Sequence, residues 1–201
     1  MKFLSVLIKP ASSLCNLRCR YCFYEDVSRQ REQMSYGVMT KGVMKHLIDR
    51  IFEAVDEDGT VVFAFQGGEP TLAGLSYYRE FVVYVDSKKK NRTICYVLQT
   101  NGTLLDDEWG VFFRENQFLV GVSLDGYESN TNEFRIDSEG SGIYRNIMNG
   151  IDAFETIWGR IQYFSSDHTE IIQACKGVLF IFKKSRFFLC AMYTVSWRIA
   201  L

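Results

Sequence analysis

The chain has 201 residues, of which 47% are hydrophobic, and a formal net charge of −1. That length and apolar content suffice for one domain with a sizeable core. The near-neutral charge and the lack of a basic block argue against nucleic acid or an anionic membrane as a partner, and no run of about 18 apolar residues predicts a membrane span.

The N-terminal stretch MKFLSVLIKP is too short for a signal peptide and lacks a small-residue cleavage site. We therefore expect a cytoplasmic protein, in which thiols stay reduced. Clustered cysteines in that compartment indicate a metal site or catalysis rather than disulfides.

Short apolar runs alternate with helix-like segments along the first 157 residues. The expected strands, all rich in β-forming residues, are residues 3–8, 61–65, 93–98 and 118–124. The expected helices, all with one apolar face, span about residues 43–55 (after an N-cap at Thr40), 75–85, 106–116 and 143–157. Strands that are apolar on both faces and alternate with helices are typical of a parallel sheet built from βαβ units.

Every unusual polar motif comes directly after one of these strands. A cysteine cluster follows the first strand, QGGEPT the second, QTNGT the third, and SLDG overlaps the end of the fourth. The carboxyl ends of parallel strands are where ligands bind in α/β proteins. We therefore expect the four motifs to form one site.

The cysteine cluster has the spacing C-x3-C-x2-C, formed by Cys15, Cys19 and Cys22. Structural zinc takes four ligands, and neither His46 nor His168 lies near the triplet. An iron–sulfur cluster held by three thiolates leaves one iron open, as a catalytic metal centre does. We favour the iron–sulfur cluster and keep zinc as the alternative.

The cluster CNLRCRYC resembles that of the radical S-adenosylmethionine (SAM) superfamily. Together with KPASSLCNLRCRYCFY, FAFQGGEPTLAGL, LQTNGTLLDDEW and FLVGVSLDG, it resembles the anaerobic sulfatase-maturating enzymes over about residues 3–156. The resemblance implies an α/β fold, a partial, incomplete parallel (βα) barrel of the radical SAM type. It also implies a [4Fe–4S] cluster whose open iron binds S-adenosyl-L-methionine.

The resemblance assigns roles to twelve residues. The metal ligands would be Cys15, Cys19 and Cys22. The cofactor contacts would be Tyr21 (methionine moiety), Gly67, Gly68 and Glu69 (ammonium), Ser123 (ribose) and Arg135 (carboxylate). The residues lining the peptide substrate would be Tyr24, Gln66 and Asn101. The residue types suit these roles, since glycine permits close backbone approach, a carboxylate pairs with an ammonium, and arginine binds carboxylates through two hydrogen bonds.

In this family an adenosyl radical removes a Cβ hydrogen from a Cys or Ser of a sulfatase polypeptide, and loss of an electron and a proton then leads to formylglycine. The implied partners are a sulfatase polypeptide and an electron donor such as flavodoxin or ferredoxin. Two alternatives stay open: another peptide-modifying radical SAM enzyme, for example one that forms thioether cross-links, and an inactive fragment that binds the cluster and SAM.

The resemblance ends near Trp158. Family members continue into a domain with auxiliary iron–sulfur clusters and the catalytic base, so we expect residues 1–157 to be the radical SAM portion and that later domain to be absent. Residues 158–201 are divergent, and a one-base frameshift near codon 158 would restore the expected next strand if suitable synonymous codons are used. A true short variant is the alternative. Either way, we expect strand 118–124 to be an unpaired edge, which favours aggregation.

Overall fold

The computed structural model describes residues 1–158, 161–165 and 179–183. Its centre is a six-stranded, wholly parallel sheet with the order β1-β2-β3-β4-β6-β5. The strands are β1 Phe3–Ile8, β2 Thr60–Phe65, β3 Thr93–Thr100, β4 Phe118–Leu124, β5 Ile161–Ser165 and β6 Leu179–Lys183. The sheet is open, so the fold is the partial barrel expected from the sequence.

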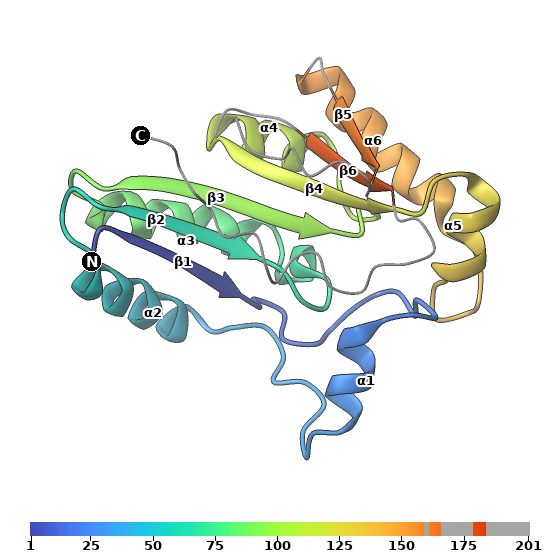
Figure 1. Cartoon of the computed structure of the whole chain (residues 1–201), viewed down its shortest axis with the longest axis horizontal. Helices are drawn as coiled ribbons and strands as arrows, with labels where there is room; N and C mark the ends of the chain where they lie inside the picture. Colours follow the sequence, from blue (N-terminus) through green and yellow to red (C-terminus); the bar gives the residue numbers. More distant parts are fainter. Residues whose placement is uncertain (159–160, 166–178, 184–201) are drawn as a thin grey trace.

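Helices follow the strands in the βα order expected. They are α1 Phe23–Arg29, α2 Lys41–Ala54, η1 Pro70–Ala73, α3 Leu75–Lys88, α4 Asp107–Glu115, α5 Glu128–Phe134 and α6 Tyr144–Trp158. In Figure 1 the arrows of β1 to β4 point toward the end of the molecule at which α1 and α5 lie. No helix among the described residues is long and apolar enough to cross a membrane.

The four expected strands and four expected helices are confirmed. Thr40 caps α2 as predicted, because its side chain accepts a hydrogen bond of 3.3 Å from the backbone N–H of Val43. The helices α1 and α5, which have seven residues each, were not predicted from the sequence. Helices this short carry too few apolar positions for a 3.6-residue period to be read.

The expectation that the fourth strand would be an unpaired edge is wrong. β6 pairs with β4 in parallel, with Val120 opposite Leu179, and β5 pairs with the far side of β6. The sequence of β6, LFIFK, is rich in the aliphatic and aromatic residues that strands prefer. The rest of the segment 159–201 lies outside the described residues.

Aromatic side chains fill the space between the sheet and α3. The rings of Phe63 and Phe65 on β2 both meet Phe81 of α3 edge to face, with centroids 5.1 and 5.0 Å apart. Tyr96 on β3 stacks on Phe118 of β4 at 4.7 Å. Such pairs add about 0.5–1.5 kcal/mol beyond the area they bury. This packing fixes the strands, and with them the loops at their carboxyl ends.

Arg92, just before β3, closes the end of α2. Its guanidinium donates to the carbonyl of Phe52 at 2.7 Å and to that of Val55 at 2.6 Å, and it lies over the Phe52 ring. Only 9% of Arg92 is exposed. The last carbonyls of a helix have no partner inside the helix and attract a cation. Arg92 supplies the missing hydrogen-bond donors at the end of α2.

We expect Arg92→Met to lower the free energy of unfolding by about 2 kcal/mol, because two buried carbonyls lose a charged donor. Urea denaturation followed by circular dichroism measures the loss. Arg79→Met is the matched control, since Arg79 makes an exposed pair with Glu108 at 3.5 Å and should change stability by less than about 0.5 kcal/mol. Equal losses for the two variants would contradict the assigned role of Arg92.

Candidate cofactor-binding site

The loops that follow the first four strands meet at one end of the sheet. The backbone N–H of Glu69, after β2, donates to the carbonyl of Leu14 in the cysteine loop at 2.7 Å. Asn101, after β3, donates through its side chain to Asn16 of the same loop at 2.9 Å. Tyr21 donates through its hydroxyl to Asp125, after β4. The expectation that the four motifs would come together is therefore met.

Two glycines allow the second loop to lie against the cysteine loop. Gly67 and Gly68 have φ angles of +106° and +58°, a region that side chains disfavour. A Cβ at Gly68 would lie 2.3 Å from the carbonyl oxygen of Leu14, and one at Gly67 would lie 2.9 Å from the side chain of Lys9. Both glycines are needed for close approach between the loops.

The carboxylate of Glu69 is buried between the second and third loops, with only 1% of the residue exposed. Its Oε1 accepts hydrogen bonds from the backbone N–H of Thr71 at 3.0 Å and from the hydroxyls of Thr71 and Thr100 at 2.6 and 2.7 Å. Its Oε2 accepts from the backbone N–H of Asn101 at 2.7 Å. One carboxylate therefore joins the end of β2 to the end of β3.

Burial raises the pKa of the Glu69 carboxyl, and the hydrogen bonds from Thr71, Asn101 and Thr100 oppose that rise. A buried carboxylate costs several kcal/mol unless donors replace the lost water. Here four donors do so. The sequence-based expectation paired this carboxylate with an ammonium group, whereas in the structure its protein partners are the neighbouring loops.

Asn16 extends this network into the cysteine loop. Its side-chain amide donates to the hydroxyl of Thr103 at 2.9 Å, and its carbonyl oxygen accepts from the amide of Asn101. The Asn101 carbonyl oxygen in turn accepts from the backbone N–H and the hydroxyl of Thr103 at 3.0 and 2.7 Å. Asn101 is 7% exposed, so most of its side chain is committed to joining the loops.

The three cysteines of the loop are free thiols and half-buried. Burial raises the pKa of Cys15 from 9.0 to about 11, partly offset by the N–H of Leu17, which donates to its sulfur at 3.4 Å. Burial also raises the pKa of Cys19. The proximity of Cys19 and Cys22 contributes to the raised pKa of Cys15, and that of Cys22 contributes to the raised pKa of Cys19.

The fourth loop supplies a buried ion pair next to the thiols. Arg135 donates to Asp125 through Nε at 3.0 Å and through Nη2 at 3.4 Å. Tyr21 donates to the same carboxylate, and its ring lies 5.5 Å from the guanidinium carbon of Arg135. Burial raises the pKa of the Tyr21 hydroxyl, so the phenol stays protonated. Asp125 thus orients both Tyr21 and Arg135.

The remaining expected residues lie along the same end of the sheet. Ser123 of β4 accepts a hydrogen bond of 2.9 Å from the side chain of Gln99 of β3. The Lys9 ammonium lies 4.4 Å from the centre of the Tyr24 ring. Gln66 directly follows β2; its backbone N–H donates to the carbonyl of Ile8 at 3.0 Å, and the residue is half-buried.

The cysteine loop suits an iron–sulfur cluster. Each thiolate of such a cluster binds a different iron and commonly accepts hydrogen bonds, as Cys15 does from Leu17. Among the described residues, no three His, Cys, Asp or Glu side chains are grouped closely enough to hold a single metal ion. The donor set, three neighbouring thiols on one loop, fits the cluster that the sequence predicts.

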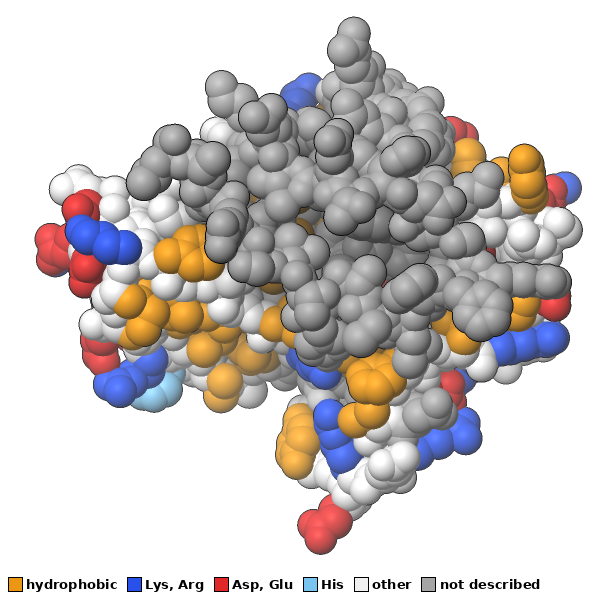
Figure 2. Space-filling view, in the orientation of Figure 1, with side chains coloured by type: hydrophobic (Ala, Val, Ile, Leu, Met, Phe, Trp, Pro, Cys, Tyr) orange, Lys and Arg blue, Asp and Glu red, His pale blue; other side chains and the backbone are white. Residues whose placement is uncertain are grey.

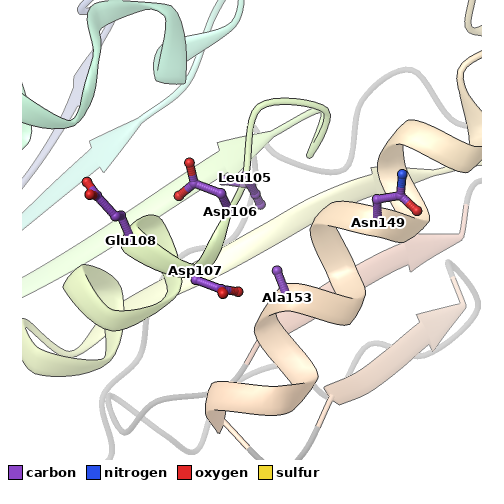
Figure 3. Close-up of a pocket in the computed structure, with 6 residues that line it drawn as sticks. All are labelled: Leu105, Asp106, Asp107, Glu108, Asn149 and Ala153. Carbon is purple, nitrogen blue, oxygen red and sulfur yellow. The ribbon is translucent and has the colours of Figure 1, made fainter.

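A pocket of about 430 Å³ lies away from this site, between α4 and α6 (Figure 3). Its carboxylates come from the start of α4, where Asp106 accepts from the backbone N–H of Trp109 and Asp107 and Glu108 occupy the first turn. Acidic residues stabilise the start of a helix. These carboxylates are therefore explained by the helix, and we assign them no ligand.

Sequence reasoning missed several residues that organise the site. They are Lys9, Asn16, Thr71, Gln99, Thr100 and Asp125. All six lie inside a motif that was recognised. Thr71 bonds Glu69 across a turn, and each of the other five has a partner 15 to 104 residues away in the chain. The one available signal was position, since each lies at the carboxyl end of a strand.

Comparison with known proteins agrees with this geometry. The sequence profile described as the Radical SAM superfamily matches residues 10–179. The chain is 47% identical over 152 residues to a cysteine-type anaerobic sulfatase-maturating enzyme of Clostridium novyi, covering 75% of this chain and 40% of that protein. It is 36% identical over 151 residues to a serine-type enzyme of Bacteroides thetaiotaomicron, covering 75% of this chain and 36% of the relative.

A solved structure described as native anSMEcpe with bound AdoMet and Cp18Cys peptide is similar over 80% of this chain and 43% of that chain. The TM-score is 0.71 and the sequence identity 39%. The chain therefore spans 36% to 40% of the length of the curated relatives described above.

We expect Glu69→Gln to destabilise the protein by about 2 kcal/mol, because its NH2 group must face an N–H or hydroxyl donor. Urea denaturation at pH 7 measures the loss. Glu53→Gln is the control, since Glu53 makes an exposed pair with Arg50 and its loss should cost less than about 0.5 kcal/mol. An unchanged midpoint for Glu69→Gln would show that the buried carboxylate does not hold the loops.

We expect the Cys15 thiol of the metal-free chain to be alkylated slowly by iodoacetamide. With a pKa of about 11 rather than 9.0, it holds about a hundredfold less thiolate at pH 8.

The same shift in pKa makes stability depend on pH. Because the folded chain keeps the Cys15 proton more tightly than the unfolded chain, the thiol stabilises the fold below pH 9.0, and that contribution is lost as the pH rises through about 11. Peptide mass spectrometry across pH 7–11 follows the reaction; a midpoint near 9.0 would contradict the desolvation of Cys15.

Proposed function

The chain belongs to the radical SAM superfamily, and from that premise we propose that the loops described above bind a [4Fe–4S] cluster and SAM to oxidise a Cys or Ser of a sulfatase polypeptide to formylglycine. The observation that carries the proposal is the attachment of a three-thiol loop to the loop after β2 through Glu69 and Leu14. The relatives named as sulfatase-maturating enzymes support the choice of substrate.

We assign the cluster to Cys15, Cys19 and Cys22. When bound, it would supply one electron for the reductive cleavage of SAM. The chain holds the three thiols in place and partly shields them from water. This burial raises the pKa of both Cys15 and Cys19. Loading the cluster displaces the protons of these thiols, so assembly should release protons.

We assign four parts of the site to SAM. The Gly67–Glu69 segment is assigned to its ammonium, Ser123 to the ribose, Tyr21 to the methionine moiety, and Arg135 to the carboxylate. The structure supports Arg135 in this role because a buried guanidinium held by Asp125 keeps its orientation before the ligand arrives. Gln99 orients Ser123 in the same way.

We assign Tyr24, Gln66 and Asn101 to the peptide. Lys9 above the Tyr24 ring holds the aromatic side chain in one place. Asn101 is bonded to Asn16 and Thr103, and so acts mainly by fixing the loop that faces the peptide. The electron donor is proposed to be a carrier of the flavodoxin or ferredoxin type.

A second outcome is favoured by one observation, the divergence of residues 158–201 from the family pattern. On this alternative the described domain, residues 1–157, binds the cluster and SAM but does not oxidise a peptide. The frameshift hypothesis for residues 158–201 belongs to the same alternative. Genomic reads test it, and an unambiguous frame without a nearby single-base insertion or deletion would refute it.

The test is anaerobic cluster reconstitution followed by reductive SAM cleavage with and without a sulfatase peptide. We expect 5′-deoxyadenosine from the wild type and none from Cys22→Ala. Cys95→Ser is the matched control, because Cys95 lies on β3 outside the cysteine loop and should leave the iron content unchanged. A peptide mass loss that fits formylglycine supports the full activity, and cleavage without it supports the fragment. Bound zinc without iron would refute the cluster.

A further inference from the structure

A second pocket, of about 400 Å³, opens beside the cysteine loop. Two of the three thiols and three arginines lie in its wall, which is lined by Arg18, Cys19, Arg20, Cys22, Glu25 and Arg29. None of the residues assigned to SAM lines it. We call the surface formed by Arg18, Arg20 and Arg29 around these thiols the arginine pocket.

Positive charge is concentrated on this part of the chain. Residues 9–31 contain five basic and two acidic residues and carry a net +3, whereas the whole chain carries −1, so the remainder is acidic at −4. Figure 2 shows blue side chains gathered around the projection formed by α1. The charge is therefore local to the segment that holds the proposed cluster ligands.

The arginines differ in how their charge is compensated. Arg29 pairs with Glu25 at 2.6 Å, and Arg18 bonds the carbonyls of Cys15 and Leu17, which carry no net charge. Arg20 is exposed, and its guanidinium makes no hydrogen bond or ion pair within the described part of the chain. The pocket therefore keeps a net positive charge that a partner can meet.

An exposed aromatic side chain lies next to the pocket. Phe23 follows Cys22 directly and is 47% exposed, with its ring 5.8 Å from that of Tyr24. Exposed aromatic residues bordered by arginines are typical of the residues that carry binding energy in protein interfaces. A small ion would not use such a side chain, so the surface fits a protein better than a free anion.

We propose that the arginine pocket and Phe23 form the docking surface for an acidic, one-electron carrier protein that reduces the cluster. This inference rests on the proposed function, because the cluster is the electron acceptor. One electron leaves the reduced carrier and enters the cluster; no bond forms or breaks. Docking here would bring the carrier to the wall that contains the thiols of Cys19 and Cys22.

The physical demands of electron transfer match this surface. Redox partners form small interfaces and short-lived complexes, so a high association rate matters more than affinity. Complementary charge raises association rates by factors of 10 to 10³, and salt weakens the effect because the Debye length is about 10 Å at 0.1 M. A carrier with an acidic surface would be attracted to the +3 segment and repelled by the acidic remainder.

The test measures the rate at which reduced flavodoxin, an acidic carrier, reduces the reconstituted chain under anaerobic stopped flow. We expect Arg20→Glu/Arg29→Glu to lower the second-order rate constant at least tenfold at 20 mM salt. Arg20→Gln/Arg29→Gln should give a smaller loss, and the wild-type rate should fall with added salt. Lys89→Glu/Lys90→Glu is the control, since it makes the same charge change at the far end of α3 and should stay within twofold of wild type.

Two further measurements separate this inference from the proposed function. Photoreduced 5-deazariboflavin, a small uncharged reductant, should reduce all variants at equal rates, and its failure to reduce even the wild type would refute the cluster. Titration of oxidised flavodoxin onto the metal-free chain tests docking alone, with weaker binding expected for Arg20→Glu/Arg29→Glu. Unchanged binding and reduction by that variant, or an equal loss in the lysine control, would overturn the docking surface.

Discussion

The hydrogen bonds to the buried carboxylate of Glu69 hold the loops of the site together. A charge that is 1% exposed is tolerated only if donors surround it, and the donors come from the turn after β2 and from the end of β3. Satisfying the charge therefore fixes the distance between two loops. The backbone N–H of the same residue bonds Leu14, so the cysteine loop is positioned by it as well.

The parallel sheet explains why these loops can meet at all. Consecutive strands pair in register, Ile8 beside Phe65 and Phe65 beside Leu98, so that the loops that follow β1 to β4 leave the sheet at the same end. The aromatic core between β2, β3, β4 and α3 keeps the strand ends from shifting. With the scaffold rigid, a few hydrogen bonds suffice to hold the polar loops, including the link from Asn16 to Asn101.

Much of this could be predicted from the sequence because its signals are local. Apolar runs and helical periods predicted the four βα units, Thr40 predicted the start of α2, and the motif positions predicted one site. What could not be predicted depends on pairing across the chain. The role of Asp125 requires Tyr21 and Arg135 to be seen together, and the partner of β4 is a strand more than 50 residues later.

The proposed function requires three thiolates that hold a cluster with one open iron, beside residues arranged to bind SAM. Mössbauer spectroscopy of the chain reconstituted with iron-57 tests it most directly. We expect a four-iron cluster in which one iron changes its isomer shift when SAM is added, while the other three do not. Four irons that are unaffected by SAM, or a preparation that retains no iron, would contradict it.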